Sequence, residues 1–474
     1  MDELIVRVNG GGRACVPALS MTAYVLIERE DWFEKEIAFV RRFLRPGMRA
    51  LDVGANYGTY TLAMAQAVRP DGRVWAYEPA RATARYLRKT IDHNDLDNVE
   101  LREAALSDRE GTGRLRLDEQ SETNRLSEDG DAGEQVALTT FDAEQTRHDW
   151  GNIDFVKIDA EGAELDIIRG GERFFATQSP LVMFERMAVD VPNEGAQAAF
   201  RERGYGLYKL IGPDKYLVPV DRDERYDAFD LNLFACKSDR ATALAAAGLL
   251  AATRGATFEA SGGIGLALWR RQGFAAAFAQ VSTALDPRYE RALDAYAVWR
   301  DADRPLVERC GALLAGAEIL RTLAADSRNL ALLSTCARVA HEAGMRLLAV
   351  DCLGRMLDLM KGERPLLHAP FWPPARRYDT LRPAADRDNW FLAAAFEAYE
   401  KRRAFSSQFV APDTLLGLEW LAASPYASPE MERRRQLTAI RAGRQRLRQP
   451  SPLLLKAGAG HLNPQLWGGR TETA

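Results

Sequence analysis

The sequence lacks the features of disulfide-rich and zinc-cluster proteins. It has five cysteines, and no two are close enough to form a CxxC motif: Cys15, Cys236, Cys310, Cys336 and Cys352. This scatter predicts neither a disulfide framework nor a clustered zinc site. Thiols of this kind suit a reducing compartment, so the cytoplasm is the expected location.

Long apolar runs and an excess of basic charge are missing as well. The longest apolar run, 241–253, is too short to cross a bilayer and is followed by Arg254. Residues 1–4 include acidic side chains where a signal peptide has basic ones, so no secretory leader is expected. The formal net charge is −4, whereas a general nucleic-acid binder carries a clear basic excess. We therefore expect neither a membrane span nor a nucleic-acid partner.

The pattern along the chain predicts several parts, because 474 residues are too many for one ordinary core. Residues 1–45 predict a lead-in of strand and helix, with a strand at 24–27. Residues 46–238 alternate strand-like and helix-like segments, which is typical of a mostly parallel, doubly wound α/β sheet. Residues 240–448 predict an all-α domain, and 449–474 a loosely ordered tail.

Within 46–238 the alternation is regular. Strands are predicted at 50–53, 74–77, 99–103, 155–159 and 181–184, and helices at 59–67, 80–94 and 163–175. Segments 205–210 and 231–236 also resemble strands and suit an antiparallel pair at the sheet edge.

The region after residue 240 predicts helices without clear strands. Segment 329–360 is similar to a tetratricopeptide unit, with small residues at Gly344 and Ala349 where two helices pack closely. Asp286-Pro287 is predicted to end another helix. No second copy follows at the expected period, so loose helical repeats and a plain helical bundle both stay open. Such a domain is expected to recruit the acceptor or a protein partner.

The first chemical motif is Leu-Asp-Val-Gly-Ala-Asn-Tyr-Gly at 51–58, a strand that runs into a glycine turn and then a helix. It differs from the dinucleotide fingerprint G-x-G-x-x-G, because the central glycine is missing and Asn56 stands near its place. A cofactor without phosphate tolerates this change, and S-adenosylmethionine is such a cofactor. We therefore predict that Asp52, Gly54, Asn56 and Gly58 belong to a cofactor site.

Two acidic residues follow the next strands. Glu78 lies twenty positions after Gly58 at a strand end, where a carboxylate can accept hydrogen bonds from both ribose hydroxyls. Asp108 follows the third strand, where it can accept a bond from the adenine amino group. Each residue has a structural alternative: Glu78 can cap the helix that begins near Pro79, and Asp108 can cap a turn.

The second motif is Lys-Ile-Asp-Ala-Glu-Gly-Ala-Glu at 157–164, a strand that ends in carboxylates. Because the carboxyl ends of the strands line one crevice, both motifs are expected in the same cleft. Asp159 or Glu185 is predicted to orient or deprotonate an acceptor hydroxyl, with Glu161 beside them. Lys157 is predicted to tune the pKa of its neighbours or to pair with Glu185.

Three alternatives stay open at this motif. Glu161 and Glu164 can simply compensate the helix dipole. Asp159, Glu161 and Glu185 offer oxygen ligands that suit Mg²⁺, although the preferred prediction has no metal. His93 and His148 are weak candidates for a base.

These segments resemble FkbM-type S-adenosylmethionine-dependent methyltransferases over about residues 30–236. The resemblance rests on 51–58, 77–79, Asn94, 105–108, 157–164 and Glu185. It implies a Rossmann-like class I methyltransferase sheet with antiparallel edge strands, followed here by the helical domain.

The resemblance also implies roles and chemistry. Gly54, Asn56 and Glu78 would contact the cofactor, and Asp108 would lie by the adenine. The implied reaction is O-methylation of a hydroxylated small molecule or glycan. The chain departs from the family at 140–143, where Thr-Phe-Asp-Ala replaces the usual Thr-Leu-Asp-Asp, and this change is expected to alter the entrance to the site.

Other classes fit the sequence less well. An NAD-dependent oxidoreductase on a similar sheet would need the middle glycine and a Tyr-x-x-x-Lys helix, and the sequence has neither. An inactive scaffold would not need Gly54, Glu78 and Asp159. An enzyme that methylates nucleic-acid amino groups would need an Asn/Asp-Pro-Pro-Tyr segment, which is absent.

Overall fold

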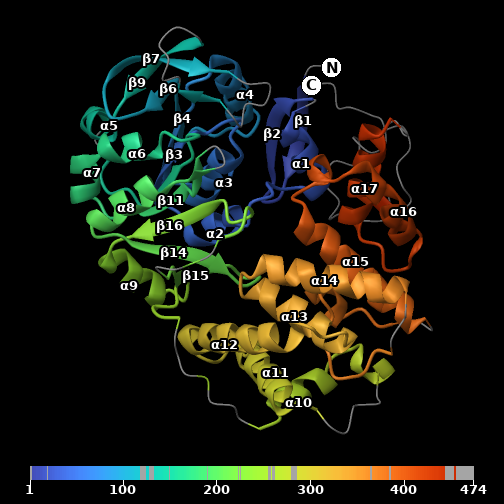
Figure 1. The fold of residues 1–474 in the computed structure, drawn as a ribbon. Coiled ribbons are helices and arrows are strands. Elements are labelled where there is room, and N and C mark those ends of the chain that lie inside the picture. The colour runs from blue at the N-terminus through green and yellow to red at the C-terminus, as the bar shows by residue number, and fades with distance from the viewer. Residues whose placement is uncertain are drawn as a thin grey trace. The chain divides into compact units, whose positions relative to one another are not determined.

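The protein is described from a computed structural model. It describes residues 3–18, 20–117, 124–126, 133–148, 150–188, 191–221, 224, 226–254, 258, 262–278, 285–362, 366–383, 386–443 and 453–454. The chain divides into two compact units (Figure 1). Unit 1 comprises Met1–Leu210 and Lys215–Leu250, and unit 2 comprises Ile211–Asp214 and Ala251–Ala474. The domain boundaries expected from the sequence stay predictions.

Unit 1 begins with a hairpin of β1 (Glu3–Val8) and β2 (Gly12–Pro17), followed by helix α1 (Met21–Arg29). The strand predicted at 24–27 is wrong. Ser20 caps the helix by accepting a hydrogen bond from the backbone N–H of Ala23 at 3.1 Å. A run of four apolar residues fits a strand and a helix equally, and the cap favours the helix.

An eight-stranded sheet forms the centre of unit 1, in the order β15-β14-β16-β11-β10-β3-β4-β5. The bounds are β3 (Arg49–Val53), β4 (Arg73–Tyr77), β5 (Val99–Arg102), β10 (Phe155–Ile158), β11 (Leu181–Glu185), β14 (Gly206–Ile211), β15 (Tyr216–Pro219) and β16 (Asn232–Cys236). Strands β5, β4, β3, β10 and β11 are parallel, and β16 runs antiparallel between β11 and β14.

The middle of this sheet is buried on both faces, as a parallel sheet covered by helices requires. The four residues of β10 are all buried, and so are four of the five residues of β3. Ile158 pairs with Val53 on one side and with Phe184 on the other. The carboxyl ends of β3, β10 and β11 therefore lie level with each other.

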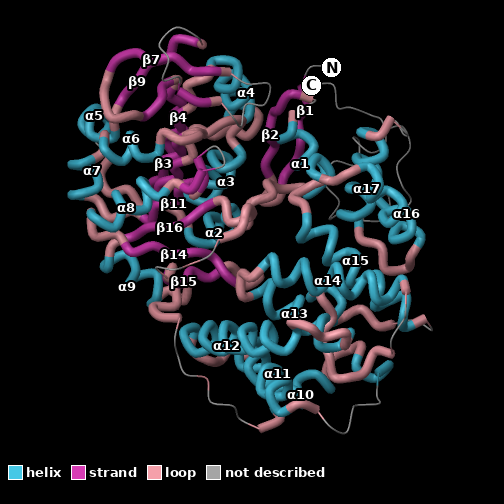
Figure 2. The backbone as a smooth tube through the Cα atoms, viewed as in Figure 1, coloured by secondary structure: helices cyan, strands magenta, loops and turns pink. Residues whose placement is uncertain are grey.

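Helices cover the sheet on two sides (Figures 1 and 2). One side carries α2 (Glu36–Phe43), α3 (Thr59–Val68) and α4 (Arg81–Asp92), and the other carries α5 (Phe141–His148), α6 (Glu164–Arg169), α7 (Glu172–Thr177) and α8 (Glu194–Glu202). After β16 the chain enters α9 (Ser238–Ala246).

The single helix predicted at 163–175 is in fact two helices, α6 and α7. They are separated by Gly170-Gly171. A Cβ added at Gly170 would lie 2.0 Å from the backbone oxygen of Ser107, so only glycine permits this approach.

A smaller four-stranded sheet carries no clear signal in the sequence. It consists of β6 (Ala104–Leu106), β7 (Gly111–Arg116), β8 (Arg125–Leu126) and β9 (Glu134–Thr139), in the order β6-β9-β7-β8. Two further short strands, β12 (Met187–Ala188) and β13 (Val191–Pro192), pair antiparallel.

The long helices of unit 2 are α10 (Ile264–Arg270), α11 (Pro287–Arg300), α12 (Leu306–Ala324), α13 (Leu330–Glu342), α14 (Arg346–Lys361), α15 (Arg387–Arg403), α16 (Leu415–Ala423) and α17 (Pro429–Arg441). None of the helices in the described residues has the length and apolarity that a membrane span needs. The five cysteines are free and buried.

The start of α11 and the turn between α13 and α14 fall at positions that the sequence analysis singled out. Asp286 caps the start of α11 by accepting from the N–H of Arg288 at 2.8 Å. The helix predicted to end at Asp286-Pro287 falls partly on 279–284, which lie outside the described residues, so this part stays a prediction. Gly344 joins α13 to α14 with a φ of 80°, which suits the tight turn expected there. The tetratricopeptide-like assignment stays a prediction.

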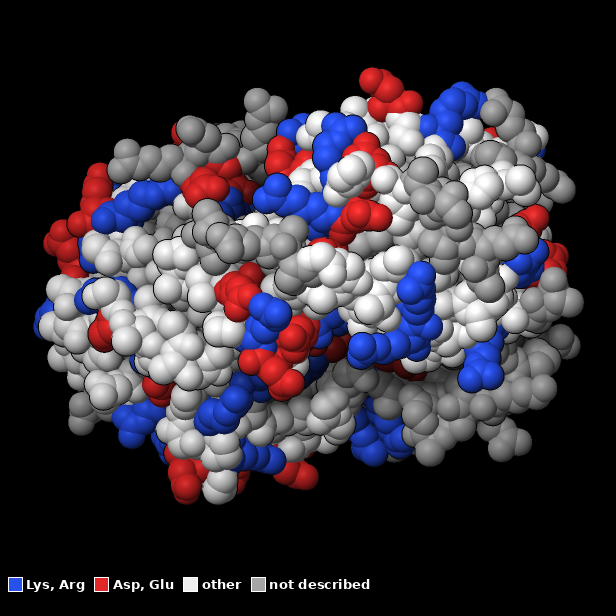
Figure 3. Space-filling view, turned by 90° about the horizontal axis from the view of Figure 1, so that it is seen from below, with Lys and Arg blue, Asp and Glu red and all other residues white. Residues whose placement is uncertain are grey.

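Charges of both signs share the face drawn in Figure 3. Lysine and arginine side chains are interspersed there with aspartate and glutamate side chains, and the coloured side chains form no continuous basic area. This mixture agrees with a formal net charge of only −4.

Candidate active site

A cavity in unit 1 lies at the carboxyl ends of the central strands. Seven of the predicted site residues line it: Gly54, Asn56, Glu78, Lys157, Asp159, Glu161 and Glu185. The other three, Asp52, Gly58 and Asp108, are not among its lining residues. The two motifs, about a hundred residues apart in the chain, therefore meet as the sheet topology predicts.

The glycine turn after β3 is shaped by close contacts within the protein. Gly54 has a φ of 75°, and a Cβ added there would lie 1.7 Å from the backbone oxygen of Asp159. At Gly58, φ is 89° and an added Cβ would lie 2.4 Å from a methyl carbon of Leu87. Both positions thus require glycine for packing alone, and Gly54 lets the end of β10 approach the turn.

Glu78 at the end of β4 is 6% exposed and organises this turn. Its Oε2 accepts from the backbone N–H of Asn56 at 2.9 Å, and its Oε1 accepts from that of Ala80 at 2.9 Å. Burial raises the pKa of Glu78 to about 7, against the opposing effect of these two bonds. The bond to Ala80, just before α4, agrees with the capping alternative, but the same carboxylate also lines the cavity.

Lys157 is a buried cation held by carboxylates. Its Nζ lies 3.0 Å from Asp159 Oδ2 and 3.7 Å from Asp52 Oδ1, and it donates to the Gly54 carbonyl at 3.3 Å. Burial would lower the pKa of Lys157, but the neighbouring carboxylates outweigh it and raise the pKa above its ordinary value. The expected pairing with Glu185 is not found among the described ion pairs of Lys157.

Asp52 supports Lys157 from beneath the cavity. It is fully buried, its Oδ2 accepts from the Thr61 hydroxyl at 2.6 Å, and burial raises its pKa. Asp52 therefore acts on the cavity through Lys157 and does not face a ligand directly.

Glu164 folds the loop that presents Asp159 and Glu161. Its Oε1 accepts from the backbone N–H groups of Ala160 at 2.9 Å and Gly162 at 3.4 Å, and its Oε2 accepts from Asn193 at 2.9 Å. It is also the first residue of α6. Glu164 thus has a structural role in the loop.

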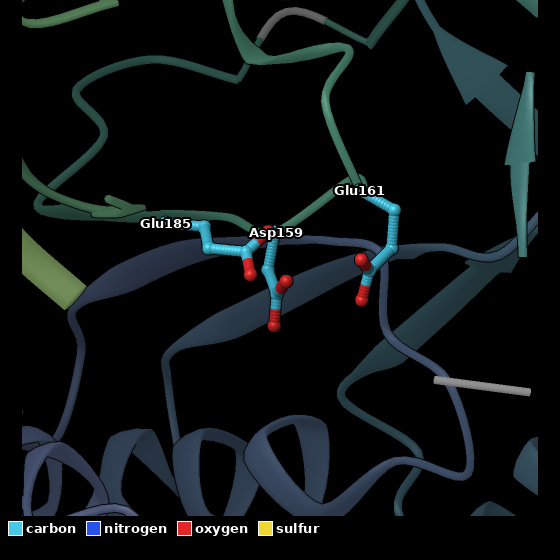
Figure 4. A group of neighbouring side chains, drawn as sticks. All are labelled: Asp159, Glu161 and Glu185. Carbon is cyan, nitrogen blue, oxygen red and sulfur yellow. The ribbon is translucent and has the colours of Figure 1, made fainter. Parts of the chain in front are cut away.

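Asp159, Glu161 and Glu185 direct their carboxyl groups into one space (Figure 4). One oxygen from each lies within 4.8 Å of the others, a set that suits a divalent cation. The Lys157 ammonium beside Asp159 already supplies positive charge to this cluster, and a metal ion would have to compete with it. The expectation that the site holds no metal stays a prediction.

Two features of this cluster are energetically unfavourable. Burial and the neighbouring carboxylates raise the pKa of Glu185 far above its ordinary value. Glu161 has a φ of 50°, which is unfavourable for a residue with a Cβ. Backbone strain like that of Glu161 is concentrated at ligand-binding sites.

Glu34 is a cavity-lining carboxylate that the sequence analysis missed. It precedes α2, and its Oε2 accepts from the Tyr60 hydroxyl at 2.7 Å and from Asn232 Nδ2 at 3.0 Å. Its partners lie 26 and 198 positions away, so no local pattern in the sequence indicates the contact.

Several other candidates lie away from the cavity. The His93 ring is hydrogen-bonded to the Lys89 carbonyl at 2.7 Å, outside the cavity. The His148 ring contacts Arg102 at 2.7 Å. Asp108 pairs with Arg109 at 3.0 Å, and its predicted place by the adenine stays a prediction.

Segment 140–143 does not line the cavity, and its expected effect on the entrance stays a prediction. Phe141 is fully buried and stacks on Phe174 with ring centroids 4.8 Å apart. Asp142 accepts from the backbone N–H of Phe174 at 2.8 Å, so this segment joins α5 to α7 and lines no part of the cavity.

The fold and the cavity together define a class: an open α/β domain with a cavity where its central strands end, which is the place where ligands bind in such sheets. Within it, residues 52–205 match the family model of the methyltransferase FkbM domain. The N-terminal half of the chain thus carries an FkbM methyltransferase domain, which confirms the resemblance seen in the sequence. The strand order agrees with the predicted class I methyltransferase sheet, and a helical region follows it.

Solved structures show partial likeness to the chain. An FkbM methyltransferase from Methylobacillus flagellatus is 16% identical over 42% of this chain and 50% of its own, with a TM-score of 0.27. An S-adenosylmethionine-dependent O-methyltransferase from Thermotoga maritima is 16% identical over 49% of this chain and 77% of its own, with a TM-score of 0.26. A precorrin-6y C5,15-methyltransferase from Geobacter metallireducens is 17% identical over 43% of this chain and 86% of its own, with a TM-score of 0.26. No curated protein matches the chain.

Proposed function

We propose that unit 1 binds S-adenosylmethionine in this cavity and transfers its methyl group to a hydroxyl of a sugar, glycan or other hydroxylated metabolite. The observation that carries the proposal is the meeting of the glycine turn, Glu78 and the Asp159 cluster in one cavity. When bound, the cofactor supplies a methyl group on a sulfonium, which needs no metal to activate it.

The charge of the cavity supports a cationic ligand. Five carboxyl groups line it: Glu34, Glu78, Asp159, Glu161 and Glu185. The basic residues that line it are Lys157 and Arg125. S-adenosylmethionine carries a sulfonium, an ammonium and a carboxylate group, and its net charge is positive. The ionised carboxylates of this set favour it; Glu185, whose pKa is raised to about 11, is not one of them at neutral pH.

The glycine turn argues against the NAD alternative. In the dinucleotide fingerprint the central glycine lets the backbone approach the pyrophosphate, and Asn56 stands near its place here. The backbone N–H of Asn56 already donates to Glu78 at 2.9 Å, so in this structure it is not free for a phosphate oxygen. The turn therefore lacks the means by which such folds hold a dinucleotide.

Glu78 can accept further hydrogen bonds, as binding of the ribose hydroxyls would require. Each carboxylate oxygen accepts one backbone bond in the structure and has a second lone pair that can accept a hydroxyl. Ala105 and Leu106 supply apolar surface to the same cavity for the base. The helical unit 2 is proposed to recruit the acceptor or a partner protein.

Calorimetric titration tests the proposal. Wild-type protein is expected to bind S-adenosylmethionine and to bind NAD at least ~10-fold more weakly. Glu78→Ala is expected to weaken S-adenosylmethionine binding by about 10- to 100-fold, because two hydrogen bonds to a charged acceptor are lost. Glu103→Ala, at an exposed carboxylate paired with Arg88, is the matched control. Unchanged affinity in Glu78→Ala would mean that the ribose site is misplaced.

The affinity for S-adenosylmethionine is expected to depend on pH. The pKa of Glu78 is raised to about 7 without ligand, and hydroxyl donors bind its ionised form. Affinity should therefore rise as pH increases from about 6 to 8. Glu78→Gln removes the titrating group, so the affinity of this variant for S-adenosylmethionine should change less with pH than that of wild type. A wild-type affinity that falls over this range would contradict the assignment.

A further inference from the structure

Glu34 occupies a distinct place beside the cofactor site. It lies ahead of the FkbM domain, which spans 52–205, and its partner Asn232 lies beyond it at the start of β16. Both residues line the same cavity as Asp159. The segments that flank the FkbM domain thus complete the cavity with groups that the domain itself does not contain.

The hydrogen bonds of Glu34 fix one of its oxygens and leave the other open. Tyr60 and Asn232 both donate to Oε2, at 2.7 Å and 3.0 Å. Oε1 has no hydrogen-bond partner among the described residues. Two donors on one oxygen fix the plane of the carboxylate, so Oε1 is positioned to accept a bond from a ligand.

Two of the other acidic groups around the cavity already have protein partners. Asp159 is held by Lys157 at 3.0 Å, and Glu78 accepts from two backbone N–H groups. Glu34 differs from these two in that both of its donors bind one oxygen, Oε2.

The acid–base properties of Glu34 agree with its geometry. Burial and the nearby carboxylates of Asp159 and Glu36 together raise the pKa of Glu34 to about 7, against the opposing effects of the Tyr60 bond and Lys157. A general base works best when its pKa lies near the working pH.

We propose that Glu34 Oε1 accepts the proton of the acceptor hydroxyl that is methylated. This rests on the function proposed above. As the hydroxyl oxygen bonds to the methyl carbon, the carbon–sulfur bond breaks and its electron pair stays on sulfur. The hydroxyl proton passes to Glu34, which later releases it to water. Tyr60 and Asn232 are positioning residues that orient the carboxylate.

The aromatic residues beside Glu34 indicate the shape of the acceptor. Trp32 and Phe33 also line the cavity, with ring centroids 4.6 Å apart. Aromatic faces next to a hydrogen-bonding carboxylate suit a ring that has both C–H and hydroxyl groups, such as a pyranose.

The test compares wild type, Glu34→Gln, Glu34→Asp and the control Glu103→Gln. The methyl acceptors are methyl α-glucopyranoside, methyl α-rhamnopyranoside and methyl β-galactopyranoside, and the release of S-adenosylhomocysteine is followed. Glu34→Gln should keep its calorimetric affinity for S-adenosylmethionine and lose at least ~10²-fold in kcat with little change in KM. Glu34→Asp should keep part of the activity. Turnover by Glu34→Gln at the wild-type rate overturns the proposal.

A second measurement tests Glu34 as the base if none of the three sugars is methylated. Infrared difference spectra of wild type against Glu34→Gln, with S-adenosylhomocysteine bound, should show a carboxyl that titrates between about pH 6 and 8 and is missing from the variant. Its absence overturns the base assignment. Failure of wild type to bind S-adenosylmethionine would instead overturn the proposed function.

Discussion

Replacement of Glu342 by glutamine is expected to lower the free energy of unfolding of unit 2 by about 3–5 kcal/mol near neutral pH. Glu342 is 4% exposed and accepts five hydrogen bonds. The donors are Tyr296 at 3.0 Å, Trp299 at 2.6 Å, Arg338 at 2.7 Å, and Arg376 at 2.9 and 2.7 Å. The amide removes the negative charge that Arg338 and Arg376 share. Arg338, which is 1% exposed, then keeps only Asp379 at 2.8 Å as a counter-ion among the described residues, and the weakened compensation of its charge is the source of the loss.

The loss is expected to depend on pH with a defined sign. Burial would raise the pKa of Glu342, but Arg338 and Arg376 outweigh it and hold the pKa well below its usual value of 4.5. A carboxyl with a lowered folded pKa stabilises the protein above its unfolded pKa, and this contribution disappears as pH falls through the folded value. The difference between variant and wild type should therefore shrink below about pH 4.5. Urea unfolding at several pH values, followed by circular dichroism, measures it. Equal midpoints near neutral pH would contradict the network.

Lys157→Met is expected to destabilise unit 1 by about 3–5 kcal/mol, because it leaves the buried Asp52 carboxylate without its cation. Asp52 is fully buried and Lys157 is 3% exposed, so water cannot replace the lost charge. The pKa of Asp52, already raised by burial, should rise further. A carboxyl with a raised folded pKa costs stability as pH increases through that pKa, so the deficit should grow from acid to neutral pH.

Two further variants make the Lys157 experiment specific. The double variant Asp52→Asn/Lys157→Met removes both charges and should recover much of the lost stability. Lys89→Met, at an exposed lysine paired with Glu3, should leave the unfolding midpoint nearly unchanged. If Lys157→Met unfolds at the wild-type midpoint, the buried ion pair is not part of the fold.

The sheet of unit 1 could be predicted because its signals are local. The five strands predicted from 50–53 to 181–184 are present within one residue of their expected ends. Each is a short run next to a segment with helical periodicity, and two of them carry motifs whose spacing is set by the turn that follows. The antiparallel pair of β14 and β16 was also predicted, although β15 extends the sheet beyond it.

The errors occurred where short patterns are ambiguous. The apolar run at 24–27 fits two periodicities, and the cap at Ser20 favours the helix. Asp286-Pro287 is an N-terminal cap followed by proline, a pair that begins α11 and that the sequence analysis did not assign to a helix start. The break at Gly170-Gly171 follows from a close approach to Ser107, which is 63 positions away and invisible in the local sequence.

The candidate site was predictable only in part. Gly54, Glu78 and Asp159 belong to contiguous motifs and line one cavity. Glu34 was missed because its role depends on Tyr60 and Asn232, which only the folded chain brings together. Glu164 has the same motif as Asp159, but its three bonds show that it supports the loop.

A crystal structure of the protein with S-adenosylhomocysteine would show where the cofactor binds. We expect the ligand in the strand-end cavity, with both ribose hydroxyls within hydrogen-bond distance of Glu78 and the sulfur on the side of Glu34 and Asp159. A ligand bound elsewhere, or a cavity closed by its own side chains, would contradict this expectation.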